Sequence, residues 1–285
     1  MQRIPRKHPR HAPASHRIAR GRTRHAPPSH LIPRDHPRYV SLKIRQKMVA
    51  GLASGIAAPE GLLAHGRGEA FDYLLGEKTQ PEAKAAIKAA AAALLLAERP
   101  VLSVNGNVAS LVPEEMIALA RALPKSVIEV NLFHRNEGRI QKITRLLETF
   151  SRGKVQILGP GANARLPGLS SQRAKTFKEG MLAADVVLVP LEDGDRAEAL
   201  KRAKKKVIAI DLNPMSRTAR SADITIVDNI VRAMPILVSE VKALKKASRA
   251  RLERIVLAFN NQKNLQKTLE RMQGKLPSAS FSSRS

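Results

Sequence analysis

The sequence of 285 residues contains no cysteine and no tryptophan, and aromatic residues make up only 3% of it. Without cysteine the chain forms no disulfide, no zinc–thiolate site and no thiol nucleophile. With so few aromatic rings it lacks the stacking platforms typical of proteins that bind single-stranded nucleic acids. The longest apolar run, AAIKAAAAALLLA, is interrupted by Lys88 and is shorter than the roughly 18 residues of a membrane span. We therefore expect a cytoplasmic protein that makes no use of a membrane.

Acidic residues are also scarce, since 24 Asp and Glu accompany 50 Lys and Arg and the net charge is +26. Clustered Lys and Arg release counterions from phosphate backbones, so this charge first favours a nucleic-acid partner. No helix-turn-helix, zinc-finger or RNA-recognition signature accompanies the charge. A solvated surface, or a general attraction for anionic substrates and RNA with nonspecific nucleic-acid contact by the basic ends, explains it equally well.

The chain divides by composition into three parts. Residues 1–30 contain eight Arg or Lys and no acidic residue, are rich in Pro and His, and lack apolar periodicity, so we predict a disordered basic extension. Residues 31–259 form the predicted domain, and residues 260–285 a basic helical C-terminal tail.

Within the predicted domain, helical patterns run from His36 and over residues 81–98, where a proline is suited to the first helical turn. Short β-branched runs follow and alternate with helices near 114–123, 137–149 and 195–204. The strands are predicted at 101–104, 127–130, 155–158, 185–190, 207–210 and 223–227. This alternation predicts an α/β fold with a mostly parallel sheet, helices on both faces, and helical segments at both ends.

Ligands of such folds bind beyond the carboxyl ends of the strands, where this sequence places three polar segments, at residues 105–107, 191–196 and 211–220. In the third, Asp211 is placed to bond a ribose and Arg217 or Arg220 to clamp a phosphate. The alternative is a proline-containing turn with solvated arginines. Neither familiar glycine-rich phosphate loop, G-x-G-x-x-G or G-x-x-x-x-G-K-[ST], occurs in the sequence.

The other two polar segments also have two interpretations each. Glu192, Asp193 and Asp195 are hard oxygen ligands suited to Mg²⁺, or they form a turn with Asp195 capping the next helix, which we favour. Asn105 and Asn107 flank a glycine and either bind polar groups of a substrate or satisfy the turn.

The stretch AHGRGEAFDY, residues 64–73, places His65, Arg67 and two acids around two glycines. One interpretation is a polar turn that opens a helix over residues 69–75, with Gly68 near its cap. The other is an anion site, in which Arg67 and free backbone amides face a phosphate or carboxylate.

Several longer motifs, taken together and in order, resemble one known family. They are HPRYVSLKIR, GLLAHGRGEAFDYLLGEKT, LLAERPVLSVNGNVASLVP, NLFHR, ADVVLVPLEDGDRAEAL and DLNPMSRTARSADITIVDNIVRA. This wording closely resembles the archaeal phosphopantothenate synthetases, also called 4-phosphopantoate–β-alanine ligases. The resemblance extends from Ile32 to about Phe259. Residues 166–182 follow it only loosely, and residues 1–30 have no counterpart.

The resemblance implies a Rossmann-like fold and a homodimeric enzyme of coenzyme A biosynthesis. Such an enzyme condenses 4-phosphopantoate with β-alanine to 4'-phosphopantothenate and converts ATP to AMP and pyrophosphate, with Mg²⁺ offsetting negative charge. Transferred to matching positions, it places at the nucleotide site Arg45, Arg67, Asp211, Leu212, Asn213, Arg217, Thr218, Asn229 and Ile230. It also favours the anion-site interpretation of AHGRGEAFDY.

The expected chemistry assigns further roles. A carboxylate is a poor acyl donor, so we expect 4-phosphopantoate to attack the α-phosphate of ATP and form an acyl-adenylate, which β-alanine then opens. Arg67 would act on the phosphate, His65 would orient the acyl phosphate or accept the amine proton, and the substrate site would include His65, Asn105 and Asn107. The metal ligands stay unassigned. A basic nucleic-acid-binding protein and a noncatalytic nucleotide-binding protein are the competing hypotheses.

Overall fold

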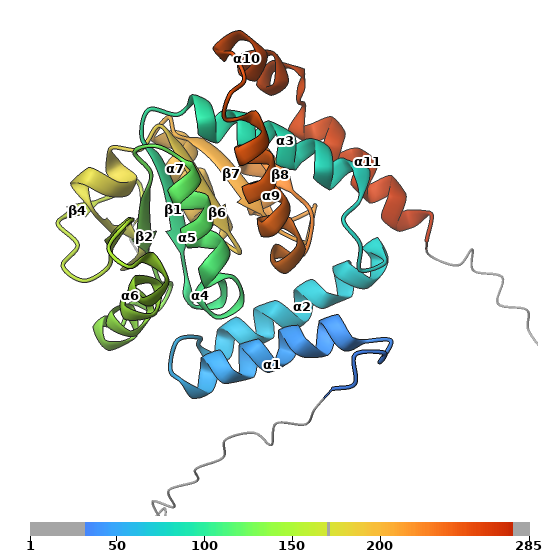
Figure 1. Cartoon of the computed structure of the whole chain (residues 1–285), viewed down its shortest axis with the longest axis horizontal. Helices are drawn as coiled ribbons and strands as arrows, with labels where there is room; N and C mark the ends of the chain where they lie inside the picture. Colours follow the sequence, from blue (N-terminus) through green and yellow to red (C-terminus); the bar gives the residue numbers. More distant parts are fainter. Residues whose placement is uncertain (1–31, 170–171, 276–285) are drawn as a thin grey trace, which may run out of the picture. The chain divides into compact units, whose positions relative to one another are not determined.

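The computed structural model describes residues 32–169 and 172–275, so the extension predicted over residues 1–30 lies outside the described residues. The centre of the fold is a six-stranded sheet in which every pair of neighbouring strands is parallel (Figure 1). Its strands, in sheet order, are β3 (Gln156–Leu158), β2 (Val127–Val130), β1 (Pro100–Val104), β6 (Val186–Pro190), β7 (Lys206–Ile210) and β8 (Ile224–Ile226). Each predicted strand is confirmed to within one residue at either end.

Helices cover both faces of this sheet. Consecutive side chains of a strand point to opposite faces, so Leu188 of β6 packs in one buried cluster while Val187 and Val189 pack in another. The first cluster includes buried residues of α3 (Pro81–Leu96), α5 (Pro113–Ala122), α6 (Glu137–Ser151) and α9 (Ile230–Leu244), and the second those of α7 (Gly194–Arg202). The predicted α/β architecture is therefore confirmed.

The remaining elements are short or lie at the ends of the described chain. They are α1 (Tyr39–Ala53), α2 (Pro59–Leu75), α4 (Gly106–Leu111), α8 (Arg217–Ser221), α10 (Arg249–Ala258), α11 (Asn261–Gln273), the antiparallel pair β4 (Ala164–Arg165) and β5 (Lys175–Thr176), a 3₁₀ turn η1 (Gln172–Ala174) and a π turn η2 (Lys178–Leu182). The segment predicted as a basic helical tail thus contains α11. Leu265 and Met272 of α11 are buried against Leu75, and Arg271 binds Glu82 of α3 through two hydrogen bonds of 2.9 Å.

The strand order creates a crevice between β1 and β6. Counted along the chain, the six strands lie in the order 3-2-1-4-5-6, so the connections leave β1 and β6 in opposite directions. Asn105, just after β1, donates a hydrogen bond to the carbonyl of Leu191, just after β6, at 2.9 Å. Two of the three polar segments predicted at strand ends therefore meet at the point where α/β proteins bind ligands.

Helices α1 and α2 run side by side at this edge of the sheet (Figure 1). The turn after β1 approaches their connection closely, because a Cβ on Gly106 would lie 2.5 Å from the carbonyl oxygen of Ile56. Only glycine permits this approach.

The structure corrects our view of AHGRGEAFDY. The whole stretch lies inside α2, which begins at Pro59, ends at Leu75 and is capped by Gly76 in the left-handed conformation, with φ of 72°. The predicted turn and the predicted helix start at Glu69 are wrong. The prediction of free backbone amides in this stretch is wrong as well, because N–H groups within a helix donate hydrogen bonds to preceding carbonyls. Proline at the first turn and glycine at the end define a helix that tolerates the internal glycines.

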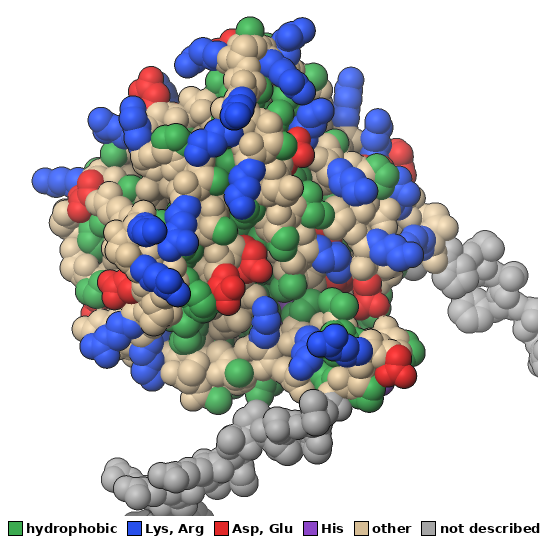
Figure 2. All heavy atoms as spheres, in the orientation of Figure 1, with side chains coloured by type: hydrophobic (Ala, Val, Ile, Leu, Met, Phe, Trp, Pro, Cys, Tyr) green, Lys and Arg blue, Asp and Glu red, His purple; other side chains and the backbone are tan. Residues whose placement is uncertain are grey.

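Positive charge is spread over one whole face of the molecule (Figure 2). Figure 2 shows Lys and Arg side chains distributed over the whole visible face, with fewer acidic groups between them. Of the helices in residues 32–169 and 172–275, none combines the length and the apolar content that crossing a membrane requires.

Candidate functional site

Two adjoining cavities open at the carboxyl edge of the sheet, beside α2. The first, of about 280 Å³, we call the β1 cavity; it is lined by residues that include Glu60, Asn105, Asn107, His134, Arg139 and Arg173. The second, of about 370 Å³, we call the β7 cavity; it is lined by residues that include His65, Phe71, Asp211, Asn213, Arg217 and Thr218. Ala64, Arg67, Asn107, Leu191 and Asp193 line both.

Arg67 lies at the junction of the two cavities. It is exposed, and no other described residue forms a hydrogen bond or an ion pair with its guanidinium. An uncommitted guanidinium on the wall of a cavity is suited to two parallel hydrogen bonds to a phosphate or carboxylate. The guanidinium of Arg67 is therefore accessible to a ligand in either cavity.

His65 lies two residues earlier on α2 and lines the β7 cavity. Its side chain is 11% exposed, and its Nε2 atom is buried, 3.9 Å from Oε1 of Glu69, with no hydrogen-bond partner among the residues that the structure describes. Burial lowers the pKa of His65 below its ordinary value of 6.5, although Glu69 opposes this effect. The imidazole is therefore neutral at pH 7 and able to accept a proton.

Arg45 lines neither cavity. It lies on α1 and forms a forked ion pair with Glu69 of α2, with Nε–Oε1 and Nη2–Oε2 distances of 2.8 and 2.6 Å. The hydrogen bond to Arg45 lowers the pKa of Glu69. In this structure Arg45 joins α1 to α2, and its assignment to the nucleotide site stays a prediction.

The segment after β7 forms one wall of the β7 cavity. The carboxylate of Asp211 accepts hydrogen bonds from the backbone N–H of Asn213, at 2.9 Å, and from the hydroxyl of Ser216, at 2.5 Å. Burial raises the pKa of Asp211, while these hydrogen bonds and the charge of Arg67 oppose the rise. Leu212 also lines the cavity, so the three predicted residues 211–213 lie together at this wall.

Arg217 and Thr218 follow at the start of α8. Arg217 binds Glu198 through two hydrogen bonds and forms an ion pair of 3.0 Å with Asp195. Thr218 is buried, and its hydroxyl donates to the carbonyl of Glu192 at 2.8 Å. Both residues line the β7 cavity, Arg217 with its charge already paired.

Asn229 and Ile230, also predicted at the nucleotide site, line neither cavity. Asn229 caps α9 and donates a hydrogen bond from Nδ2 to Asp72 of α2 at 2.9 Å, and Ile230 is buried in the core. The described structure does not bring them to Arg67.

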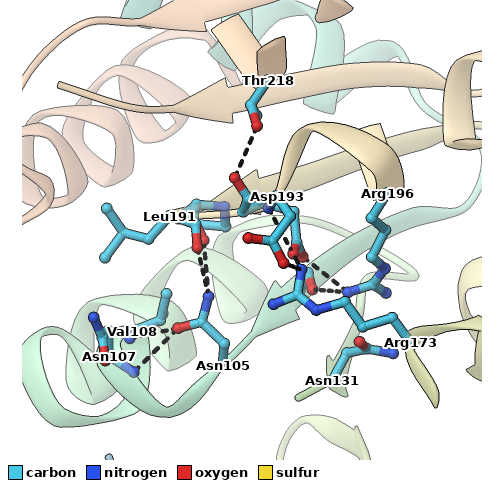
Figure 3. Close-up of polar contacts among 12 residues, drawn as sticks. Asn105, Asn107, Val108, Asn131, Arg173, Leu191, Asp193, Arg196 and Thr218 are labelled. Atoms are coloured by element: carbon cyan, nitrogen blue, oxygen red, sulfur yellow. Dashed lines mark hydrogen bonds and ion pairs between the residues drawn. The ribbon is translucent and has the colours of Figure 1, made fainter. Parts of the chain in front are cut away.

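The side chains of the two asparagines after β1 bind backbone groups of their own turn and of segments remote in sequence (Figure 3). Oδ1 of Asn105 accepts from the backbone N–H groups of Asn107 and Val108, both at 3.1 Å, so Asn105 caps α4 as well as binding the turn after β6. Nδ2 of Asn107 donates to the carbonyl of Gly61 on α2 at 2.8 Å. Asn107 thus fixes the part of α2 that lines both cavities.

The acidic residues after β6 do not form a metal site of their own. Asp193, not Asp195 as expected, is the N-cap residue of α7; Asp195 lies in the first turn and pairs with Arg217. The carboxylate of Glu192 is buried between Arg173 and Arg196. Among the residues that the structure describes, no three His, Asp or Glu side chains are grouped as metal ligands. This donor set does not fit a magnesium ion held by the protein alone.

Sequence reasoning missed Arg173, together with His134 and Arg139. Arg173 lies in η1, within residues 166–182, where no strand or helix pattern is visible and the family wording is followed only loosely. For His134 and Arg139 the sequence did offer a signal, because His134 belongs to the family motif NLFHR and Arg139 lies in the helix that follows it. With Arg67, these side chains give the β1 cavity a concentration of basic groups.

Comparisons with known proteins identify the family of this chain. A family model described as phosphopantothenate/pantothenate synthetase matches residues 82–275. Proteins named 4-phosphopantoate–β-alanine ligase in Thermococcus onnurineus and Thermococcus kodakarensis are each 52% identical over 241 residues, which cover 85% of this chain and 92% of the relative. The Methanosarcina mazei protein of the same name is 46% identical over 238 residues, covering 84% and 92%. The chain therefore belongs to the phosphopantothenate/pantothenate synthetase family.

Proposed function

We propose that the chain is an ATP-dependent ligase that joins 4-phosphopantoate to β-alanine and releases AMP and pyrophosphate, as a step of coenzyme A biosynthesis. The observation that supports this most is Arg67, a cation that pairs with no other described residue and lines both cavities at the crevice between β1 and β6. Two anionic substrates bound in adjoining cavities would meet beside this residue. The names of the relatives identify the acid and the amine.

Each cavity suits one substrate. The β7 cavity, with Asp211 after a strand and Arg217 and Thr218 at a helix start, suits the nucleotide. The β1 cavity, with Arg139, Arg173 and His134, suits the doubly charged phosphate of 4-phosphopantoate.

In this arrangement the substrate carboxylate attacks the α-phosphorus of ATP and pyrophosphate leaves with the bridging oxygen. Negative charge increases at the α-phosphate, where Arg67 stabilises it. The amine of β-alanine then attacks the acyl carbon, and AMP leaves. The amine loses a proton in this step, which the neutral imidazole of His65 accepts. Proximity of the bound reactants supplies much of the acceleration.

Three finer statements belong to the same proposal. Mg²⁺ would enter with ATP and be bound mainly by its phosphates, because magnesium commonly keeps few protein ligands at nucleotide sites; no step above depends on it. We also propose a homodimer, as the family resemblance implies. The cytoplasm is the location that fits an ATP-dependent enzyme of coenzyme A synthesis.

A product assay with ATP, 4-phosphopantoate and β-alanine tests the proposal. We expect AMP and 4'-phosphopantothenate only when both cosubstrates are present, and their loss in Arg67→Ala. Formation of ADP would indicate another chemistry. Absence of turnover in a folded protein that still binds ATP would favour a noncatalytic nucleotide-binding protein. Retardation of nucleic acid at physiological salt without any turnover would favour a nucleic-acid-binding protein.

A further inference from the structure

Arg173 is held at the wall of the β1 cavity by an unusual set of neighbours. Its side chain is only 7% exposed, and its guanidinium lies 5.1 Å from the centre of the Phe133 ring. It forms ion pairs with Glu192 and with Asp193, the latter at 2.7 Å between Nη1 and Oδ2. Burial lowers the pKa of Arg173 to about 10, so the group is still charged at pH 7. A buried cation of this kind depends strongly on its counterions.

The two counterions differ in their freedom to move. The side chain of Asp193 is 44% exposed and lines both cavities. Glu192 lines only the β7 cavity, and its side chain is 1% exposed. Its two oxygens have further partners: Oε1 accepts a hydrogen bond from the backbone N–H of Asp193 at 3.0 Å, and Oε2 accepts one from Nη1 of Arg196 at 2.9 Å. An anion that enters the β1 cavity can displace Asp193 from Arg173 but not Glu192.

Arg196 forms an ion pair with the same carboxylate of Glu192 that pairs with Arg173. Its side chain is as buried as that of Glu192, lines neither cavity, and also donates to the hydroxyl of Ser103 on β1 at 3.3 Å. Its Nε and Nη2 atoms find no hydrogen-bond partner among the described residues. A charge buried at this cost, without access to a ligand, points to a role in holding something else in place.

A second buried glutamate fixes the backbone that carries Arg173. Glu129 of β2 accepts hydrogen bonds from the hydroxyl of Thr176 and from the backbone N–H of Met181, both at 2.7 Å. Both donors belong to the irregular segment that begins with η1. The charge of Arg196 also acts on Glu129, where it opposes the rise in pKa that burial causes. The backbone and the guanidinium of Arg173 are thus secured separately.

We propose that Glu192 is a positioning residue for the reaction: clamped by Arg196, it fixes the guanidinium of Arg173 at the wall of the β1 cavity, where Arg173 binds the anionic group of the acid substrate in exchange for Asp193. This inference rests on the proposed function for the identity of that substrate. The chemistry it requires, an anion of phosphate type bound to a preoriented guanidinium, is independent of the function.

Steady-state kinetics of Glu192→Gln test the proposal. We expect the KM for 4-phosphopantoate to rise about ten- to a hundredfold, the range for loss of a hydrogen bond to a charged group. The KM for ATP should change by less than about twofold. Arg173→Gln should give the same pattern. Because Glu192 acts through Arg173, the double variant E192Q/R173Q should lose no more than either single variant.

Glu253→Gln is the matched control, since Glu253 also pairs with an arginine four residues away, Arg249, but on the exposed surface of α10. It should leave both KM values unchanged. If Glu192→Gln leaves too little folded protein, Glu192→Asp replaces it, because this variant keeps the buried negative charge but moves it away from Arg173 by one methylene group. An unchanged KM for 4-phosphopantoate, an equal rise for both substrates, or losses that multiply in the double variant would each overturn the proposal.

Calorimetric titration with inorganic phosphate repeats the double-mutant cycle of Glu192 and Arg173 as a binding measurement, without catalysis. Phosphate sites elsewhere on this basic chain are common to all four proteins and cancel. We expect weakened binding in either single variant and no further weakening in the double variant. If no variant and no wild-type protein turns over 4-phosphopantoate, the proposed function fails while the phosphate cycle still decides the role of Glu192.

Discussion

A single buried imidazole gives the proposed amine step a pH dependence. Burial lowers the pKa of His65 below 6.5, so the proton-accepting form predominates above that pKa and is lost as the pH falls through it. We expect kcat to decline on the acid side with an apparent pKa below 6.5. His65→Gln should abolish this limb and slow turnover about 10²-fold, the lower range for general acid–base catalysis.

Pre-steady-state measurement locates this effect. Pyrophosphate release in the absence of β-alanine reports the first step alone, and a burst of normal rate in His65→Gln would confine the residue to the amine step. A wild-type acid limb that persists in the variant would assign the titration to another group. Full activity of the folded variant at every pH would remove His65 from the mechanism.

Gly66 and Gly68 form a matched pair within α2. A Cβ on Gly66 would meet no atom within 4 Å, whereas one on Gly68 would lie 3.4 Å from Cδ1 of Leu212, at the wall of the β7 cavity. Glycine costs a helix interior about 1 kcal/mol relative to alanine. We expect Gly66→Ala to raise Tm by about 2–4 °C and to leave kinetics unchanged.

Gly68→Ala should stabilise the helix similarly but raise the KM for ATP, because the new methyl group projects toward the nucleotide. Thermal unfolding and steady-state kinetics on both variants make the comparison. Equal kinetics in the two variants would indicate that the nucleotide does not approach this side of α2. A fall in Tm for Gly66→Ala would show that the backbone at this position departs from the regular helical geometry that alanine favours.

Among elements, α2 owes its place to polar ties at its two ends. Only two of its 17 residues, Asp72 and Leu75, are buried. Near its start the carbonyl of Gly61 accepts from Asn107, and near its end Asp72 binds Arg232 and Asn229 of the α9 region. This explains why the sequence predicted only the last part of the helix, residues 69–75, and missed its start at Pro59. The apolar periodicity of α2 is weak, and the partners that fix it are remote in sequence.

Asp72→Asn tests the tie at the end of α2. Oδ1 and Oδ2 of Asp72 accept from Nη2 and Nη1 of Arg232, at 2.5 and 3.2 Å, and Arg232 retains a second ion pair to Asp228. We expect a loss of about 1–3 kcal/mol in the free energy of unfolding, measured in urea. The KM values for both substrates should also rise, because α2 positions Arg67 and His65.

Asp223→Asn serves as its control. Asp223 likewise accepts from a cationic side chain, Lys201, at 2.6 Å, and from a backbone N–H, but at the opposite end of β7 from the cavity. Its loss should lower stability without altering either KM. Equal changes of KM in the two variants would show that the Asp72–Arg232 interaction affects kinetics only through the overall stability of the protein.

At the scale of the whole molecule, the regular part of the fold was predictable and the irregular part was not. Strands such as Val186–Pro190 are buried on both faces, so apolar and β-branched runs identify them directly, and their carboxyl ends locate the crevice. Arg173 enters the site from a segment without periodicity, which is held by contacts with Glu129 and Glu192 that are remote in sequence. The family motif identified residues 211–213, which form one wall of the β7 cavity. Which cationic side chains line the same cavity could be seen only in the three-dimensional structure.

The large positive charge also belongs to the whole molecule and is separable from the site. Among the described residues, those that line the two cavities lie between Ala58 and Thr218, and eight of the 50 basic residues lie in residues 1–30. We expect deletion of residues 1–30 to leave kcat and both KM values unchanged. Nonspecific binding to duplex DNA should weaken and become less dependent on salt, because the slope of log K against log salt falls by about 0.9 for each DNA phosphate that the protein no longer neutralises. Fluorescence anisotropy over a salt series, paired with the AMP assay, measures both. An unchanged salt slope would place the nucleic-acid contacts on the domain itself. Loss of soluble, active protein would show that the extension takes part in folding, and the separation of charge from catalysis would be wrong.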